Sequence, residues 1–173
     1  MQNPDGRIDP AGATLRRLNV AAPSLQSDWS GDSSKWSEEK KLASLDSTLR
    51  TKTVRILDSL RAAGFKPKIY YAWRSVAVQR QLFDQGHSKV RFSYHNAQFK
   101  NGTPRAYAID VIDRRWAWSD DAEQNGFWDA LGQAAKNEGL FWGGNWTKFK
   151  DYAHAQSFPN SKLSEIKRQS GLA

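Results

Sequence analysis

The chain has 173 residues, of which 39% are hydrophobic and 25% are charged. These are the proportions of a soluble globular protein, and the length suits one compact domain with an enclosed core. No apolar run approaches the roughly 18–20 residues that span a bilayer. The chain contains no cysteine, which excludes disulfides, thiolate nucleophiles and cysteine-ligated zinc.

The formal net charge is +8 and the chain contains eight tryptophans. A chain this basic is expected to associate with polyanions such as nucleic acid, anionic lipid or the acidic polymers of a bacterial envelope. Tryptophan suits stacking on bases or sugars as well as packing in a core. No helix-turn-helix, zinc-knuckle or aromatic-strand signature supports a specific nucleic-acid partner.

Residues 1–33 are rich in Gly, Pro, Ser, Asn and Asp and predict a loosely structured lead-in, or the remnant of a preceding module. Residues 34–173 would then form the folded domain. The first residues show no basic start followed by an apolar stretch, so we expect no signal peptide. The protein is therefore expected to be made in the cytoplasm and, if it acts elsewhere, to be carried there by other means.

The first predicted helix begins near Ser34 or Ser37, either of which can cap it. Glu38 and Glu39 follow in its first turn, where the helix dipole favours acidic side chains. Gly64 is a natural C-terminal stop. Apolar residues recur between these limits at helical spacing: Leu42, Leu45, Leu49, Ile56, Leu60 and Ala63.

Alternating apolar residues predict a strand over 66–73. Ser75 is expected to cap a second helix that reaches about Gln85, ends at Gly86 and packs its apolar residues Val78, Leu82 and Phe83. Polar chain over 88–105 precedes a short apolar strand over 107–112. A third helix is predicted over 119–138, followed by strands over 140–142 and 152–157. Helices and strands alternate without regular βαβ repetition, so the predicted fold class is α+β.

With no cysteine, a transition-metal site must use histidine and carboxylate, and the only histidines are His87, His95 and His154. A hydrolytic zinc site needs three protein ligands, an open position and a nearby carboxylate that accepts a proton. Asp151, three residues before His154, can reach the same metal without binding it. Taken singly, Asp151 could equally be a surface aspartate and His154 a buried, hydrogen-bonded histidine. Taken singly, His95 and Asp110 could likewise be structural residues without a metal.

Four segments give these residues a context: Trp73-Arg74-Ser75 with Gln79 and Leu82-Phe83; Ser93-Tyr94-His95-Asn96; Ala106-Tyr107-Ala108-Ile109-Asp110; and Trp142-Gly143-Gly144-Asn145-Trp146 with Phe149 to His154. In this order they resemble the LAS metallopeptidases, the group of lysostaphin, the D-Ala-D-Ala peptidases and sonic hedgehog. The likeness covers roughly residues 40–160. It is greatest to the branch of L-alanyl-D-glutamate endolysins and D,D-carboxypeptidases. The resemblance implies a small antiparallel sheet that carries a zinc site and is flanked by helices.

The resemblance also implies a role for each matching residue. His95, Asp110 and His154 would bind Zn²⁺, and Asp151 would be the general base. Arg74 would steady the substrate carbonyl or the oxyanion. Four residues would support or contact the substrate: Ser93, Gln79, Trp142 and Trp146.

One departure concerns spacing, because Asp110 follows His95 by fifteen residues (110 − 95), more than is usual in that family. We interpret residues 98–104 as an inserted loop, and Asn101-Gly102 within it is a strong hairpin signal. The hairpin is expected at the rim of the cleft beside the metal. His87 is the alternative ligand if the insertion displaces His95; otherwise we expect it to be exposed or close to the substrate.

The predicted activity is zinc-dependent hydrolysis of the peptidoglycan stem peptide, with L-Ala–D-Glu the preferred bond. The alternatives are a D,D-carboxypeptidase or endopeptidase that uses the same site, a non-catalytic zinc-binding module and, on charge and aromatics alone, a nucleic-acid-binding protein. The expected setting is a phage lysin released through a holin or a toxin delivered into the periplasm of a rival cell. The expected partners are peptidoglycan and, for a delivered toxin, an immunity protein or the delivery machinery.

Overall fold

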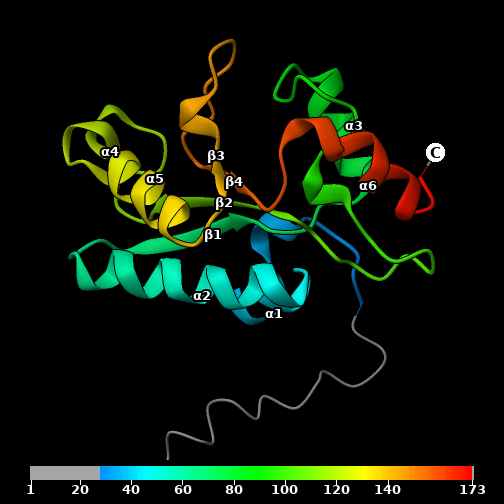
Figure 1. The fold of residues 1–173 in the computed structure, drawn as a ribbon, viewed down its shortest axis with the longest axis horizontal. Coiled ribbons are helices and arrows are strands. Elements are labelled where there is room, and N and C mark those ends of the chain that lie inside the picture. Colours follow the sequence, from blue (N-terminus) through cyan, green and yellow to red (C-terminus); the bar gives the residue numbers. More distant parts are fainter. Residues whose placement is uncertain (1–27, 173) are drawn as a thin grey trace, which may run out of the picture.

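The computed structural model describes residues 28–172, which fold around one four-stranded antiparallel sheet (Figure 1). Its strands are β1 (Pro67–Tyr71), β2 (Ala108–Asp113), β3 (Phe141–Trp142) and β4 (His154–Gln156). Their order in the sheet is β1-β2-β4-β3. The two central strands are both fully buried. Helices and a small antiparallel sheet in this arrangement confirm the predicted α+β class.

Helices cover both faces of this sheet (Figure 1). Below it in that view run α1 (Glu38–Ala43) and α2 (Ser47–Ala62), while α4 (Asp120–Gln124) and α5 (Phe127–Asn137) lie at the left. Above it, on the right, lie α3 (Val76–Asp84) and α6 (Leu163–Gln169). Four short 3-10 helices complete the fold: Ser33–Lys35, Tyr94–Asn96, Gly143–Asn145 and Asn160–Lys162. Among the described residues, no helix is long and apolar enough to cross a membrane.

The first predicted helix is two helices. Ser37 caps α1, its side chain accepting a hydrogen bond from the Lys40 amide, and Asp46 caps α2 in the same way through the Thr48 amide. Between them the chain leaves the helix at Leu45, which forms a parallel bridge to Ala106. Apolar residues keep helical spacing on both sides of the break, so the pattern does not reveal it.

The third predicted helix is also interrupted. α4 ends at Gln124, and α5 begins only at Phe127 after Gly126, whose φ is +74°. Glycine adopts this left-handed conformation without the steric cost that other residues incur. Gly126 therefore turns the chain between the two helices, and α5 packs against α2 and β3.

Helix α3 begins as predicted, with the Ser75 side chain accepting a hydrogen bond from the Val78 amide. Its apolar residues are not core residues, however: Val78, Leu82 and Phe83 are only half buried, and the buried residue of the helix is Gln79. Gln79 faces a polar network with Ser88 and Val90, and the apolar residues of the helix belong to neither hydrophobic cluster of the described residues. The prediction that its apolar stripe packs inward is therefore wrong.

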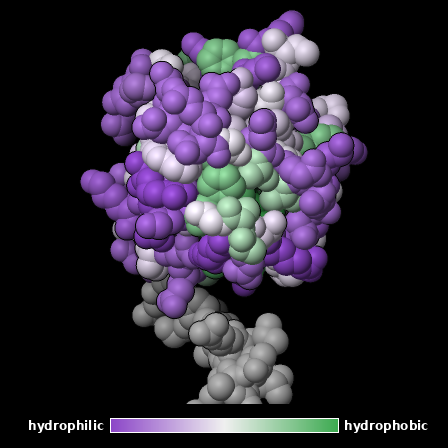
Figure 2. Space-filling view, turned by 90° about the vertical axis from the view of Figure 1, so that its left-hand side faces the viewer, coloured by the Kyte–Doolittle hydropathy of each residue, from purple (hydrophilic) through white to green (hydrophobic). Residues whose placement is uncertain are grey.

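The main core lies between the sheet and the layer formed by α2 and α5, and aromatic residues extend it toward the N-terminus. Trp29 lies in the predicted lead-in, most of which falls outside the described residues, yet it packs on Trp36, which in turn stacks on Trp73. At the end of the molecule with α4 and α5, Figure 2 shows a small apolar patch enclosed by hydrophilic residues. Hydrophilic residues cover most of the rest of that face, with smaller apolar areas at its top and edge.

Candidate metal centre and active site

Two central strands and a 3-10 helix bring three predicted ligands together. Asp110 on β2 pairs directly with His154 on β4, and side chains of directly opposed residues project from the same face of a sheet. His95 comes from the 3-10 helix Tyr94–Asn96, which is held against the sheet by hydrogen bonds from the Tyr107 amide to the Tyr94 carbonyl and from the Arg74 amide to the His95 carbonyl. We call His95, Asp110 and His154 the metal triad.

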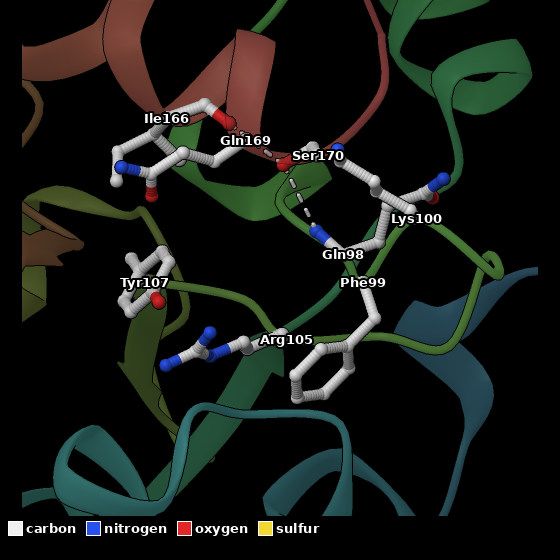
Figure 3. A pocket seen from close by; sticks show the side chains of 8 residues that line it. All are labelled: Gln98, Phe99, Lys100, Arg105, Tyr107, Ile166, Gln169 and Ser170. Atoms are coloured by element: carbon white, nitrogen blue, oxygen red, sulfur yellow. Dashed lines mark hydrogen bonds between the residues drawn. The ribbon is translucent and has the colours of Figure 1, made fainter.

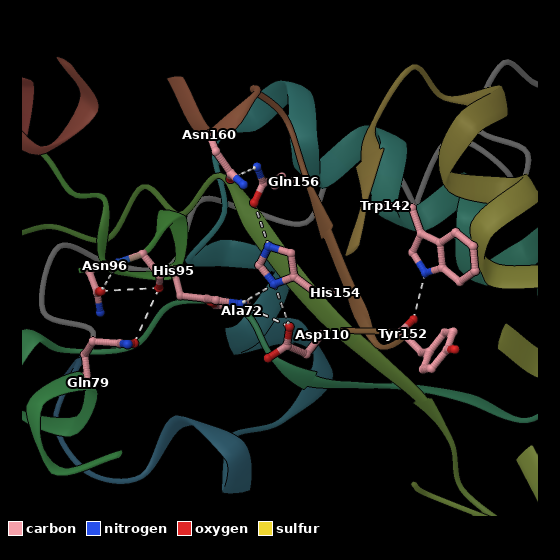
Figure 4. A network of polar contacts seen from close by, with 11 residues as sticks. Ala72, Gln79, His95, Asn96, Asp110, Trp142, Tyr152, His154, Gln156 and Asn160 are labelled. Atoms are coloured by element: carbon pink, nitrogen blue, oxygen red, sulfur yellow. Dashed lines mark hydrogen bonds and ion pairs between the residues drawn. The ribbon is translucent and has the colours of Figure 1, made fainter. Parts of the chain in front are cut away.

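The ligand atoms of the metal triad lie close to one another (Figure 4). His95 Nε2 is 3.1 Å from Asp110 Oδ1 and 3.2 Å from His154 Nδ1, and His154 Nδ1 is 3.0 Å from the same Asp110 oxygen. All three side chains are buried, with 0% of His95, 8% of Asp110 and 6% of His154 exposed. A buried cluster of this size can enclose a single ion.

The outer nitrogen of each imidazole fixes which nitrogen faces the cluster. His95 Nδ1 lies 2.6 Å from the carbonyl oxygen of Ala72. A carbonyl only accepts hydrogen bonds, so Nδ1 carries the proton and Nε2 presents its lone pair to the cluster.

His154 faces the cluster with its Nδ1 atom, and Gln156 fixes this orientation by binding Nε2. His154 Nε2 lies 2.8 Å from Gln156 Oε1, and the amide nitrogen of Gln156 donates to the Phe158 carbonyl and to Asn160 Oδ1. Because those donations settle the orientation of the amide, Oε1 accepts and His154 Nε2 carries the proton. Nδ1, which faces Asp110 in Figure 4, therefore presents its lone pair to the cluster.

Three acceptors, two imidazole lone pairs and one carboxylate oxygen, thus converge without a donor between them. Such an arrangement is stable only around a cation or a proton. A tetrahedral zinc ion with ligands at ~2.0–2.1 Å separates its ligand atoms by roughly 3.3 Å, close to the 3.0–3.2 Å found here. The residues present fit a zinc ion held by two histidines and one carboxylate, with a fourth position left open.

The protonation equilibria of the metal triad follow from burial and mutual contact. Burial lowers the pKa of His95 to about 4, which keeps its imidazole neutral. Burial also opposes the charge of Asp110, yet the two imidazoles hold its pKa well below the usual value. For His154, burial is outweighed by the hydrogen bond to Asp110 and by its charge, and the pKa is raised. A neutral His95 beside an ionised Asp110 is the ligand state that binds a metal.

Asp151 and Arg74 lie beside the metal triad. Burial, reinforced by the charge of Asp110, raises the pKa of Asp151, and Arg74 and His154 counteract this rise. The backbone holds Asp151 in place, because its amide donates to the Gly143 carbonyl and its carbonyl accepts from the His154 amide. The guanidinium of Arg74 lies 4.7 Å from the centre of the Tyr71 ring, and its buried Nε has no hydrogen-bond partner.

The two predicted cleft tryptophans have different surroundings. The ring of Trp146 lies 5.2 Å from that of His154, beside the metal triad. Trp142 instead packs on α5: a Cβ added to Gly132 would lie 2.5 Å from its ring, and its Nε1 donates to the Tyr152 carbonyl. Figure 4 shows its side chain apart from the metal triad. These contacts give the half-buried Trp142 a packing role, and its predicted contribution to the cleft stays a prediction.

Ser93 and Gln79 support the loop that carries His95. Gln79 is fully buried and donates to Ser88 Oγ and the Val90 carbonyl, while the Ser93 hydroxyl lies 3.4 Å from Gln79 Oε1. Because it is fully buried, Gln79 is placed to support this loop rather than to contact substrate. Asn96, which sequence reasoning left unassigned, completes this network by binding the Ser93 amide and the Arg74 carbonyl.

His87 is exposed just beyond α3 and is not part of the metal triad. The insertion does turn a hairpin: Gln98 pairs with Pro104, and Gly102 has a φ of +86°. Its surroundings differ from the expectation, because the Gln98 amide donates to Ser170 Oγ beyond the end of α6.

The hairpin and α6 enclose a shallow pocket of about 290 Å³ (Figure 3). It is lined by Gln98, Phe99, Lys100, Arg105, Tyr107, Ile166, Gln169 and Ser170, a set that includes no member of the metal triad. The hairpin therefore packs against the C-terminal helix.

Known proteins resemble this chain in the part that carries the site. The profile of the D-alanyl-D-alanine carboxypeptidase family matches residues 87–157, which include the whole metal triad and Asp151. The peptidoglycan L-alanyl-D-glutamate endopeptidase CwlK of Bacillus subtilis (strain 168) is 34% identical over 120 residues, which cover 60% of this chain and 70% of that protein. The crystal structure of the L-Ala D-Glu endopeptidase ChiX of Serratia marcescens has 25% identity and a TM-score of 0.49, covering 69% of this chain and 85% of that one.

The profile and the curated relative agree on a peptidase, and the relative is matched over more than two thirds of its length. The chain thus belongs to the D-alanyl-D-alanine carboxypeptidase family of LAS-type metallopeptidases.

Proposed function

We propose that the protein is a zinc-dependent endopeptidase that hydrolyses the L-Ala–D-Glu bond of the peptidoglycan stem peptide. The observation that carries the proposal is the convergence of His95 Nε2, His154 Nδ1 and Asp110 Oδ1 as three acceptors in a buried cluster. The likeness to CwlK, a peptidoglycan L-alanyl-D-glutamate endopeptidase, supports the choice of substrate.

Asp151 and Arg74 would perform the proton transfer and the charge stabilisation. When bound, zinc would polarise the scissile carbonyl and lower the pKa of water. Asp151, whose carboxylate is partly buried beside the metal triad, accepts the proton of the attacking water and then passes it to the leaving amine. Arg74, always charged, faces the negative charge that develops on the carbonyl oxygen.

The experiment is mass spectrometry of purified muropeptides after digestion, with and without a chelator. We expect products with a new N-terminal D-Glu, their loss after chelation and their return with added Zn²⁺. Products that differ from the substrate only by loss of a terminal D-Ala would instead establish the D,D-carboxypeptidase that the family description names. No cleavage of either bond by zinc-loaded protein would contradict the proposal.

Peptidoglycan lies outside the cytoplasmic membrane, so we propose that the protein acts on the cell wall after holin release or delivery into a rival cell. The net charge of +8 supports this setting, because it favours association with the anionic polymers of the envelope. A delivered toxin would also have a dedicated immunity protein as partner.

A further inference from the structure

Three aromatic residues form a continuous surface that starts beside the metal triad. The ring of Tyr71 lies 6.5 Å from that of His95, the ring of Tyr70 lies 4.9 Å from Tyr71, and the ring of Trp118 lies 4.7 Å from Tyr70. We call Tyr71, Tyr70 and Trp118 the aromatic shelf. None of the three has a role in the proposed hydrolysis.

An irregularity in strand β1 places the two tyrosines side by side. Ile69 pairs with Val111 and Tyr71 with Asp110, so Tyr70 is an extra residue without a partner on β2. In a regular strand, consecutive side chains point to opposite faces, and a bulge removes this alternation locally. Because Tyr71 is directly opposite Asp110, it lies on the face of the metal triad. The bulge thus lets Tyr70 continue the surface that Tyr71 begins.

The outer end of the aromatic shelf is held by a strained turn. Ala117 has a φ of +49°, the only positive φ among the described residues other than glycine. Its amide donates to the Asp113 carbonyl at 2.9 Å, which folds the chain back onto the end of β2. A left-handed alanine costs free energy and persists only where the surrounding structure holds it. The result is that Trp118 reaches Tyr70 while 52% of it stays exposed.

The shape of the aromatic shelf suits a sugar ring rather than a peptide backbone. The rings of Tyr70 and Trp118 are nearly perpendicular, at 87°, and so form a floor and a wall. The C–H face of a pyranose is apolar and carries partial positive charge, which an aromatic face attracts. Arg74 already covers Tyr71, so the half-exposed Trp118 offers the free aromatic surface.

We propose that the aromatic shelf binds the muramic acid residue to which the stem peptide is attached, so that the enzyme prefers stem peptides still linked to glycan. This inference rests on the proposed function. In peptidoglycan only L-Ala and a lactyl group separate the L-Ala–D-Glu bond from the sugar. At ~3.3–3.6 Å per extended residue, this linkage places the sugar roughly 7–10 Å from the scissile carbonyl. The steps of 6.5 Å and 4.9 Å from His95 to Tyr70 cover that distance, so the sugar would lie over Tyr70 with the exposed ring of Trp118 as the wall beside it.

The test compares two substrates that differ only in the sugar: a disaccharide-linked stem peptide, and the same peptide with an N-acetyl group on its L-Ala. For the wild-type protein, kcat/KM should be higher on the disaccharide-linked substrate. Trp118→Ala should lower the ratio of the two kcat/KM values about tenfold, the worth of one aromatic contact. Trp118→Tyr, which retains a ring, should keep most of the preference.

Phe99→Ala is the matched control, because Phe99 is 47% exposed but belongs to the hairpin that precedes β2. It should leave the ratio unchanged, and the zinc content of both variants should equal that of the wild type. A wild-type ratio near one, or an unchanged ratio in Trp118→Ala, would overturn the role of the aromatic shelf and leave the peptidase activity standing. Wild-type protein that cleaves neither substrate would overturn the proposed function itself.

Discussion

His95 Nε2 lies 3.2 Å from His154 Nδ1 although both atoms are hydrogen-bond acceptors. Each outer nitrogen is committed as a donor, that of His95 to the Ala72 carbonyl and that of His154 to Gln156. Two lone pairs held this close, with a carboxylate oxygen beside them, repel one another unless a cation or a proton lies between them. The chain therefore arranges these three acceptors so that they can hold a cation.

Gln156 should set the affinity of the site without touching the ion. In Gln156→Leu, His154 loses the acceptor that fixes its tautomer, and loss of such an outer contact typically weakens metal binding 10–100-fold. Competition with a chromophoric chelator measures this change in Kd. Gln133→Leu, on an exposed position of α5, is the control and should bind zinc like the wild type. An unchanged Kd in Gln156→Leu would show that the contact does not orient His154.

Asp151 should act on the rate and not on metal retention. Asp151→Asn removes the proposed proton acceptor but leaves the metal triad intact, so zinc content should remain while kcat falls by ~10²–10⁴, the usual contribution of a general base. Asp129→Asn, exposed on α5, is the matched control. Loss of zinc from Asp151→Asn would make Asp151 a ligand, and wild-type activity would remove it from the mechanism.

Asp113 should confer stability that depends on pH. Hydrogen bonds from the Arg115 side chain and from the amides of Lys66 and Arg115 lower the pKa of Asp113 to about 2. The folded state therefore holds this proton less tightly than the unfolded state, whose pKa is near 3.8. The stabilisation is complete above the unfolded value and is lost as pH falls from there toward 2.

Asp113→Asn tests this directly. At neutral pH the substitution should lower the free energy of unfolding by ~1–3 kcal/mol, since buried donors lose their charged acceptor. Urea denaturation at a series of pH values should also show a smaller decline in stability between pH 4 and 2 than the wild type shows. Equal pH dependence in the two proteins would mean that other carboxylates cause the acid sensitivity.

Much of the fold could be predicted from local signals. Ser75 and Gly64 mark real helix limits, and the apolar run before Asp110 forms the buried strand β2. The breaks at Leu45 and Gly126 could not be predicted from periodicity. They depend on a long-range bridge to Ala106 and on a left-handed glycine.

In the candidate site, too, some features follow from local sequence and others depend on tertiary contacts. The three residues of the metal triad could be predicted from their types and from the resemblance to a family. The groups that orient them could not. Ala72 contributes only a backbone carbonyl, and Gln156 contributes an amide oxygen whose direction depends on Asn160. Trp142 occurs within a recognisable motif but packs against Gly132. A motif identifies a residue, but tertiary packing decides where its side chain lies.

Elemental analysis of purified wild type, His95→Ala and His87→Ala measures whether His95 or His87 holds the ion. We expect about one zinc per chain in the wild type and in His87→Ala, because His87 is exposed and lies outside the metal triad. We expect loss of zinc in His95→Ala, since the ion would keep only Asp110 and His154 as ligands. Zinc retained in His95→Ala and lost in His87→Ala would contradict the metal triad and everything inferred from it.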